Sequence, residues 1–258
     1  MKNIELTIAL IQSSLVWESP EENRTYFSKK IEEIPSNIDV IVLPEMFTTG
    51  FTMSPKNIEI SEGQITKDWM AEEAKKECRY SRKHPIFEKG TYTNRLFFVH
   101  PEGKIEQYDK RHTFTLAGED KVYQAGRKRL IVDYKGFKIC PMICYDLRFP
   151  VWARNTEAYD ILMYVANWPK PRIKAWDTLL KARAIENMTY CIGVNRIGTD
   201  ESGYEYSGHS AVYDCLGDQI VYSEKDEILF AILRKEHIES TRQKLRFLED
   251  RDKFTLEV

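Results

Sequence analysis

Short runs of apolar and β-branched residues recur along the chain, separated by polar segments and turn residues. Runs of this length and composition are typical of strands that are buried on both faces. Tyr134-Lys135-Gly136 and Leu216-Gly217-Asp218 lie between consecutive runs and predict two hairpin turns. The predicted strands cover residues 4–11, 39–43, 95–99, 130–133, 137–143, 161–166, 190–195, 210–213, 219–222 and 228–232.

Helical patterns lie between several of these strands. Ser19, Pro20 and Glu22 occupy the N-cap, the first and the third positions of a predicted capping box. Strands that alternate with helices, with hairpins among them, indicate an α/β protein with both parallel and antiparallel strand pairs. The predicted helices cover residues 20–34, 66–78, 172–188 and 237–250, the last of them charge-rich and moderately amphipathic.

No repeat, low-complexity segment or Gly/Ser/Pro-rich linker divides the chain. We therefore expect a single domain over residues 1–258, with a C-terminal helical extension at about 235–258. The cysteines are an odd number in a long chain, so no disulfide framework is expected. They are Cys78, Cys140, Cys144, Cys191 and Cys215.

Composition and charge narrow the class of protein by exclusion. Hydrophobic residues make up 42% of the 258 residues, and 38 Lys and Arg against 40 Asp and Glu leave a formal charge of −2. This balance excludes disorder and a coiled coil, and it lacks the basic footprint of a nucleic-acid binder. No apolar run approaches the roughly 18 residues that span a bilayer, and charges interrupt the first residues where a signal peptide would begin. A cytoplasmic protein with no nucleic-acid or membrane partner is expected.

Glu45 lies in the first of three stretches that could contain catalytic residues, immediately after an apolar strand and Pro44. Its neighbours Met46, Phe47 and Phe51 would desolvate the carboxyl group and tend to raise its pKa toward the range of a general base. The alternative is a glutamate that caps a helix or a loop.

Lys110 and Cys144 lie in two further stretches of this kind. Lys110, within residues 108–112, could hold a positive charge near a developing oxyanion, or it could belong to a solvated basic turn. Cys144 follows the predicted strand at 137–143, where backbone N–H groups of a turn can lower the thiol pKa and later bind an oxyanion. The other four cysteines lie in or beside apolar patterns and are expected to be packing residues.

Glu45, Lys110 and Cys144, which lie 65 and 34 positions apart, together resemble the catalytic set of the nitrilase (carbon–nitrogen hydrolase) superfamily. The resemblance covers nearly the whole chain, and the residues after Glu45 and Cys144 look like the omega-amidase branch. The stretches that carry it are Glu45-Met46-Phe47-Thr48-Thr49-Gly50-Phe51, Cys144-Tyr145-Asp146-Leu147-Arg148-Phe149-Pro150-Val151-Trp152, Ala166-Asn167-Trp168-Pro169, Ala182-Arg183-Ala184-Ile185-Glu186-Asn187, Gly193-Val194-Asn195-Arg196 and Tyr206-Ser207-Gly208-His209-Ser210.

The resemblance implies a four-layer α-β-β-α sandwich that forms a homodimer or a higher homo-oligomer. It also implies that Glu45 is the general base, Cys144 the nucleophile and Lys110 the electrostatic stabiliser. Lys110 and the backbone N–H of Tyr145 would form the oxyanion hole, with no metal or other cofactor. Glu119 matches a second family glutamate that orients the lysine and the substrate, although Asp120 stands where relatives commonly have histidine.

The implied activity is hydrolysis of the terminal amide of a small 2-oxo acid amide, such as 2-oxoglutaramate or 2-oxosuccinamate, through a cysteine thioester. Trp168 would form part of the pocket wall, or it could be a core aromatic residue. Arg148, Arg172 and Arg196 are candidates for binding the substrate carboxylate, and each could instead form a structural ion pair. The alternatives are an N-carbamoyl amino acid hydrolase, a nitrilase, or a weakly active member with a binding role.

Residues 79–88 depart from the family pattern. An apolar strand is expected between the second helix and the strand at 95–99, but this segment carries three cations, a histidine and a proline. These residues are poor material for a buried strand. The sequence therefore predicts local disorder or altered packing near 79–88.

Overall fold

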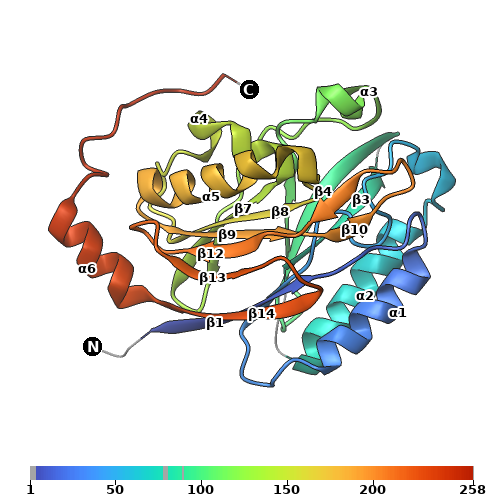
Figure 1. The fold of residues 1–258 in the computed structure, drawn as a ribbon, viewed down its shortest axis with the longest axis horizontal. Coiled ribbons are helices and arrows are strands. Elements are labelled where there is room, and N and C mark those ends of the chain that lie inside the picture. The colour runs from blue at the N-terminus through green and yellow to red at the C-terminus, as the bar shows by residue number, and fades with distance from the viewer. Residues whose placement is uncertain (1–3, 78–80, 89, 258) are drawn as a thin grey trace.

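Two six-stranded sheets lie at the centre of the molecule in this computed structural model, which describes residues 4–77, 81–88 and 90–257 (Figure 1). The strand order is β14-β1-β2-β3-β4-β5 in the first sheet and β13-β12-β9-β8-β7-β6 in the second. In each sheet three consecutive strands are parallel, and antiparallel strands continue the sheet on both sides. The structure confirms the expected mixture of parallel and antiparallel pairs.

The elements have the following bounds. The first sheet contains β1 (Glu5–Gln12), β2 (Val40–Val42), β3 (Ser81–Glu88), β4 (Thr91–Val99), β5 (Ile105–Asp109) and β14 (Glu227–Arg234). The second contains β6 (Val132–Tyr134), β7 (Phe137–Ile143), β8 (Ile161–Ala166), β9 (Tyr190–Asn195), β12 (Ser210–Tyr213) and β13 (Gln219–Ser223), and β10 (Ile197–Thr199) pairs with β11 (Glu205–Ser207). The helices are α1 (Pro20–Glu32), α2 (Glu62–Glu77), α3 (Glu119–Val122), α4 (Pro150–Ala153), α5 (Ile173–Asn187) and α6 (Lys235–Leu245), with 3₁₀ turns η1 (Pro55–Asn57), η2 (Thr115–Ala117), η3 (Cys144–Arg148) and η4 (Lys170–Arg172).

Helices cover the two outer faces of the paired sheets. Figure 1 shows α1 and α2 on one side of the molecule and α5 on the opposite side, with both sheets between them. Side chains of β1 alternate accordingly: Leu6 and Ile8 belong to the core that both sheets share, whereas Ala9 and Ile11 belong to a second core with Phe27 of α1. This arrangement is the α-β-β-α order that the resemblance implied.

Close contact fixes α5 against the second sheet. Trp176, Leu180 and Ala184, which recur at helical spacing, are fully buried on the face that meets β9. Gly193 of β9 provides the space, because a Cβ atom there would lie 2.4 Å from Leu180 Cδ1 and 2.7 Å from Trp176 Cζ2. The helix therefore packs directly on the sheet backbone at this position.

Three helix predictions differ from the structure in detail. Helix α2 begins at Glu62, four residues before the predicted start at 66. Helix α1 begins where the sequence predicts, but the Ser19 hydroxyl makes no capping bond to the backbone and instead donates to Glu22 Oε1 at 2.8 Å. The C-terminal helix spans Lys235–Leu245 and ends before residue 250, because Arg246 adopts a left-handed conformation with φ of +57°. The described part of the predicted extension beyond Asp250 contains no helix.

Strand β3 corrects the prediction for residues 79–88. Its backbone pairs with β4 from Ser81↔Phe98 to Glu88↔Thr91, so the expected local disorder is wrong for residues 81–88. Main-chain hydrogen bonds to an adjacent long strand can hold a polar segment in extended form despite its low β propensity. Within the described part of the chain, pairing with β2 covers Val42 and Ser81. Residues 79 and 80, and the packing of the β3 side chains, lie outside what the structure describes.

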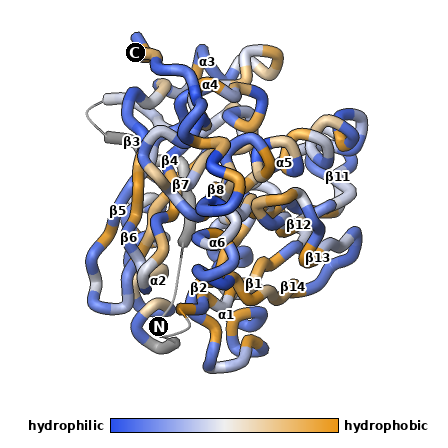
Figure 2. Tube along the Cα trace, turned by 90° about the vertical axis from the view of Figure 1, so that its left-hand side faces the viewer, coloured by the Kyte–Doolittle hydropathy of each residue, from blue (hydrophilic) through white to orange (hydrophobic). Residues whose placement is uncertain are grey.

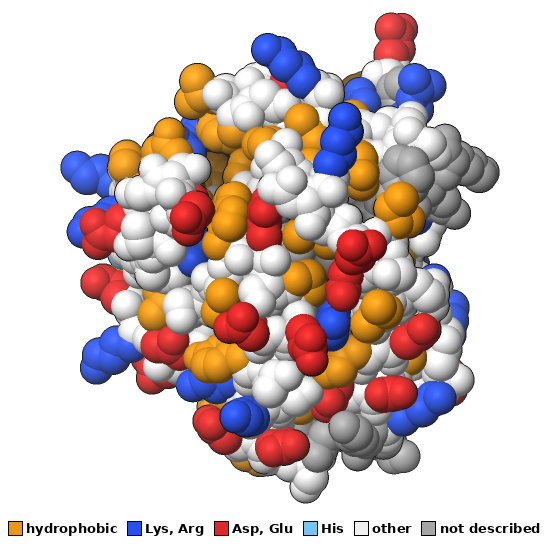
Figure 3. All heavy atoms as spheres, turned by 90° about the vertical axis from the view of Figure 1, so that its right-hand side faces the viewer, with side chains coloured by type: hydrophobic (Ala, Val, Ile, Leu, Met, Phe, Trp, Pro, Cys, Tyr) orange, Lys and Arg blue, Asp and Glu red, His pale blue; other side chains and the backbone are white. Residues whose placement is uncertain are grey.

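The surface carries charges of both signs. Figure 2 shows hydrophobic stretches along the strands and a largely hydrophilic C-terminal segment, and Figure 3 shows Lys and Arg interspersed with Asp and Glu over one face. No helix in the described ranges is long and apolar enough to cross a membrane.

Candidate active site

Three strand ends bring the predicted catalytic residues together. Glu45 lies three residues beyond the end of β2, Lys110 directly follows β5, and Cys144 directly follows β7. Strands β2 and β5 belong to the first sheet and β7 to the second, so both sheets contribute to the site. Side chains that are far apart in the sequence therefore meet at one end of the sandwich.

Lys110 lies between two carboxylates and is buried with them. Its ammonium donates to Glu45 Oε1 at 3.1 Å and to Glu119 Oε1 and Oε2 at 3.0 and 2.8 Å. The three side chains are at most 1% exposed. Burial by itself lowers the pKa of Lys110, but attraction by Glu119 and Glu45 outweighs it and raises the pKa above the ordinary value. Lys110 is thus a fixed cation and does not belong to a solvated turn.

Neutral hydrogen-bond donors hold the Glu45 carboxylate and its backbone carbonyl in place. The Asn94 amide donates to Glu45 Oε1 at 2.8 Å and to Glu119 Oε1 at 3.0 Å, so it bridges the two carboxylates. The backbone N–H of Asn167 donates to Glu45 Oε2 at 2.9 Å, and the Asn167 side chain donates to the Glu45 carbonyl at 2.6 Å. The Glu45 carboxylate therefore has one defined orientation, with Oε2 on the side away from the Lys110 contact.

The Cys144 thiol lies beside this group and is protonated in the resting site. Burial and the negative charge of Glu45 raise its pKa well above the ordinary value, and Lys110 offsets this only in part. The expectation of a lowered thiol pKa is therefore wrong, because one buried cation faces two carboxylates and a thiolate would add uncompensated charge. A nucleophile in this setting needs a base to remove its proton during attack.

The backbone at Cys144 is strained. Its φ is +44°, in the left-handed region that side chains with a Cβ rarely adopt, and it begins the 3₁₀ turn η3. The sulfur lies 3.9 Å from the Asn167 carbonyl oxygen. This conformation points the sulfur from the strand end into a cavity, where Tyr145 is its neighbour in the wall.

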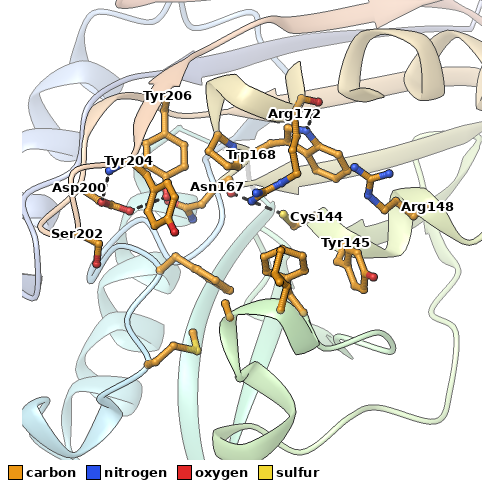
Figure 4. A pocket seen from close by; sticks show the side chains of 16 residues that line it. Cys144, Tyr145, Arg148, Asn167, Trp168, Arg172, Asp200, Ser202, Tyr204 and Tyr206 are labelled. Carbon is orange, nitrogen blue, oxygen red and sulfur yellow. Dashed lines mark hydrogen bonds between the residues drawn. The ribbon is translucent and has the colours of Figure 1, made fainter. Parts of the chain in front are cut away.

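The cavity has a volume of about 260 Å³ and opens above Cys144 (Figure 4). Aromatic side chains form much of its wall, and charged groups lie at different parts of it. Figure 4 shows Arg148 to one side of Cys144 and Asp200 to the other, with the Arg172 side chain descending towards Cys144 from above. The lining residues are Phe51, Met53, Phe114, Leu116, Ala117, Cys144, Tyr145, Arg148, Asn167, Trp168, Pro169, Arg172, Asp200, Ser202, Tyr204 and Tyr206.

The predicted binding residues separate into two groups. Trp168 lines the cavity, its indole N–H donates to the Arg172 carbonyl at 2.8 Å, and the Arg148 guanidinium lies 5.0 Å from its ring. Arg172 also lines the cavity and lies 5.0 Å from the Phe114 ring. Arg196 does not line it.

Arg196 has a structural position behind the wall. The residue is 1% exposed, and its guanidinium lies 4.6 Å from the Tyr206 ring and donates to the carbonyl oxygens of Leu15 and Thr199 at 3.4 Å. A substrate carboxylate in the cavity would therefore meet the ring of Tyr206 before it met this cation.

Sequence reasoning missed four residues of the site. Asn94 and Asn167 orient Glu45, and Asp200 and Tyr206 form one wall, with the Tyr206 hydroxyl donating to Asp200 Oδ2 at 2.8 Å. A polar asparagine directly before the predicted strand at 95–99 was the available signal for Asn94. No local pattern marks Asp200, because the β10–β11 hairpin that carries it folds over the cavity only in three dimensions.

The other cysteines that the structure describes lie in the interior. Cys140, Cys191 and Cys215 are buried and free, and burial raises the pKa of Cys140 to about 12. Cys78 lies outside the described residues. Within the described ranges, no group of three or more His, Cys, Asp or Glu is arranged to hold a metal ion.

Comparison with known proteins shows the family. The carbon-nitrogen hydrolase family profile matches residues 7–243. Omega-amidase YafV of Yersinia enterocolitica is 41% identical over 254 residues, covering 97% of this chain and 98% of that protein. The 2-oxoglutaramate amidase of Bacillus subtilis is 31% identical over 227 residues, covering 86% and 87%. A crystal structure of a CN-hydrolase superfamily protein from Xanthomonas campestris, with an arsenic adduct in its active site, has a TM-score of 0.95 at 36% identity and covers 100% of both chains. The chain therefore belongs to the carbon–nitrogen hydrolase family.

Proposed function

We propose that this protein is an omega-amidase, which hydrolyses the terminal amide of a small 2-oxo acid amide to the carboxylate and ammonia. Candidate substrates are 2-oxoglutaramate and 2-oxosuccinamate. The observation that carries the proposal is the buried group of Glu45, Lys110 and Cys144 at the floor of a small cavity. The similarity to omega-amidase YafV and to 2-oxoglutaramate amidase over most of the chain supports the substrate class.

In the first half of the reaction, Cys144 attacks the amide carbon. As the S–C bond forms, the thiol proton moves to Glu45 Oε2, the oxygen that Lys110 does not contact. The carbonyl oxygen becomes an oxyanion, which the Lys110 ammonium and the backbone N–H of Tyr145 stabilise. When the C–N bond breaks, Glu45 returns the proton to the departing nitrogen, and ammonia leaves a Cys144 thioester.

In the second half, water hydrolyses the thioester. Glu45 accepts a proton from the attacking water, and the same donors stabilise the second oxyanion. The C–S bond then breaks, the carboxylic acid product leaves, and the proton returns to the Cys144 sulfur. Glu119 keeps Lys110 in position throughout, because it accepts two hydrogen bonds from the ammonium. Each residue ends in its starting protonation state.

The cavity suits a short substrate with one carboxylate. Arg148 and Arg172 both line the cavity, and we infer that one or both bind the carboxylate that is remote from the amide (Figure 4). Trp168 forms the wall between them. A volume of about 260 Å³ accommodates a five-carbon acid amide.

An ammonia-release panel tests the proposal. We expect release from 2-oxoglutaramate or 2-oxosuccinamate and little from glutamine, asparagine or N-carbamoyl amino acids. Cys144→Ala should abolish release, while Cys140→Ala, a buried cysteine of β7 outside the cavity lining, should retain it. Turnover by Cys144→Ala at the wild-type rate would refute the mechanism.

The same panel separates the neighbouring activities. Preferential hydrolysis of an N-carbamoyl amino acid, or of a nitrile added to the panel, would reassign the substrate within the family, and no turnover at all would indicate a binding role. We also infer a cytoplasmic homodimer or higher homo-oligomer, as the family resemblance implies. Light scattering of the purified protein tests its oligomeric state.

A further inference from the structure

A second buried carboxylate lies directly behind the nucleophile. Asp146, two residues after Cys144 in η3, is 0% exposed and does not line the cavity. Its Oδ2 accepts from the Tyr108 hydroxyl at 2.7 Å and from the Ile143 N–H at 3.0 Å. Its Oδ1 accepts from the His112 N–H at 2.9 Å and lies 2.8 Å from His112 Nδ1. A carboxylate accepts hydrogen bonds, so the imidazole carries a proton on Nδ1.

The partners of Asp146 have a particular place in the sequence. Tyr108 and His112 lie two residues before and two residues after Lys110, and Ile143 directly precedes Cys144. The Asp146 carboxylate therefore connects the residues on both sides of Lys110 to the residue before Cys144, and Asp146 itself lies after Cys144. The first segment follows a strand of one sheet and the second follows a strand of the other.

Further contacts restrict the movement of these partners. The Trp152 indole N–H donates to the Tyr108 hydroxyl at 3.0 Å. The His112 ring is stacked on the Phe149 ring, with centroids 3.6 Å apart and an angle of 3° between the planes. Both aromatic partners lie on the segment that continues from η3 into α4. The lysine segment and the nucleophile turn therefore form one rigid unit around Asp146.

We propose that Asp146 is a positioning residue, which sets the place of the Lys110 ammonium relative to the Cys144 sulfur and maintains the strained turn at Cys144. This inference rests on the proposed amidase function for its kinetic consequence. Asp146 touches neither the cavity nor the reacting atoms, so it acts through Tyr108, His112 and Ile143. Its loss is expected to affect the chemical step rather than substrate binding.

Asp146→Asn is the informative change because it keeps the shape of the side chain. Two donors face each oxygen of Asp146, so either orientation of an asparagine places an NH₂ group against two donors. We expect kcat on the preferred amide to fall about 100-fold, the scale at which a small misplacement of catalytic groups acts. KM should change less than about 3-fold, since Trp168 and Arg172 line the cavity from the segment after β8, outside η3.

Asp160→Asn is the matched control. Asp160 is also buried, at 2% exposure, and accepts from the Lys138 N–H at 2.8 Å, from Lys235 and from Arg242 at 3.3 Å. It precedes β8, whereas the site lies at the other end of that strand. This variant should lose stability with kcat unchanged.

A second pair of variants keeps the test decisive where Asp146→Asn does not fold. The Asn side-chain amide can reproduce the donor at His112 Nδ1, so His112→Asn should retain several-fold more kcat than His112→Ala. The rate at which iodoacetamide alkylates Cys144, followed by peptide mass, gives a readout that needs no amide substrate. We expect Asp146→Asn, or His112→Ala in its place, to slow this alkylation relative to Asp160→Asn.

Two results would overturn the inference. One is a kcat and an alkylation rate for Asp146→Asn equal to those of Asp160→Asn once the folded fraction is matched. The other is equal kcat for His112→Asn and His112→Ala. A wild-type protein that releases no ammonia from any amide would refute the proposed function instead, and the alkylation comparison would still decide the role of Asp146.

Discussion

Replacement of Lys110 by methionine gives a quantitative test of the buried charge cluster. The ammonium donates three hydrogen bonds of 2.8–3.1 Å to Glu45 and Glu119, and none of these groups is more than 1% exposed. Lys110→Met keeps most of the aliphatic volume and leaves two carboxylates facing each other without a cation. Removal of one partner from a buried ion pair costs about 3–5 kcal/mol, so we expect the free energy of unfolding to fall by that amount.

The expected loss is a large part of the total stability. A domain of this kind has a free energy of unfolding of about 5–15 kcal/mol, and urea unfolding followed by fluorescence measures the change. Lys170→Met is the matched control, because Lys170 and its partner Glu205 are 54% and 58% exposed. Loss of an exposed pair costs about 1 kcal/mol or less. Equal destabilisation by the two substitutions would refute the reasoning.

A double variant distinguishes the cost of the unpaired carboxylates from a general loss of packing around residue 110. If the cost arises from unpaired carboxylates, Glu119→Gln should destabilise the wild type but not the Lys110→Met protein. The two substitutions should then be coupled by about 0.5–3 kcal/mol. Strict additivity would show that the carboxylates tolerate the loss of the cation. At temperatures where Lys110→Met is folded, ammonia release should fall at least about 100-fold through the loss of oxyanion stabilisation.

Three further predictions address pH, binding and packing. Because the folded state raises the pKa of Cys144, the unfolded chain loses this proton first, and stability falls as pH rises above about 8.5. From pH 9 to 10, urea unfolding should show the wild type losing about 1.2 kcal/mol more than Cys144→Ala, and parallel curves would contradict this. Arg172→Ala and Arg148→Ala should each raise KM about 10-fold or more with a smaller effect on kcat in steady-state assays, and unchanged KM in both would exclude carboxylate binding there. Gly193→Ala should lower the free energy of unfolding by about 1–3 kcal/mol by overpacking α5, and a stability equal to wild type would mean that Leu180 can move aside.

Regular elements could be predicted largely from local patterns. The strands at 137–143, 161–166, 190–195 and 210–213 have the predicted bounds, because buried apolar runs and turn residues are properties of neighbouring positions. Lys135 and Gly136 both have positive φ, as the predicted hairpin turn requires. Strand β3 was not predictable in this way, since its backbone pairs with β4 despite a charged composition. Pairing with a partner strand is a tertiary property.

The candidate site, too, was predictable in part from the sequence and in part only from the tertiary structure. The sequence by itself determined that Glu45 and Cys144 each follow a strand, whereas β5, which precedes Lys110, was not predicted. The order and spacing of the three residues carried the family resemblance. Only the tertiary structure decided that Asn94 bridges two carboxylates and that Asp146 joins the lysine segment to the nucleophile turn. Contacts between residues so far apart in sequence leave no periodic signal.

The protonation of Cys144 shows the physical reason most directly. Local sequence suggested that backbone N–H groups at a strand end would lower the thiol pKa. In the folded protein, burial and the charge of Glu45 raise it instead, and Lys110 only partly compensates. Electrostatic energies depend on burial and on the distances between charges, which the fold decides. The sequence thus determined which groups are the candidates for the chemistry, and the tertiary structure decided their charge states and their positions relative to one another.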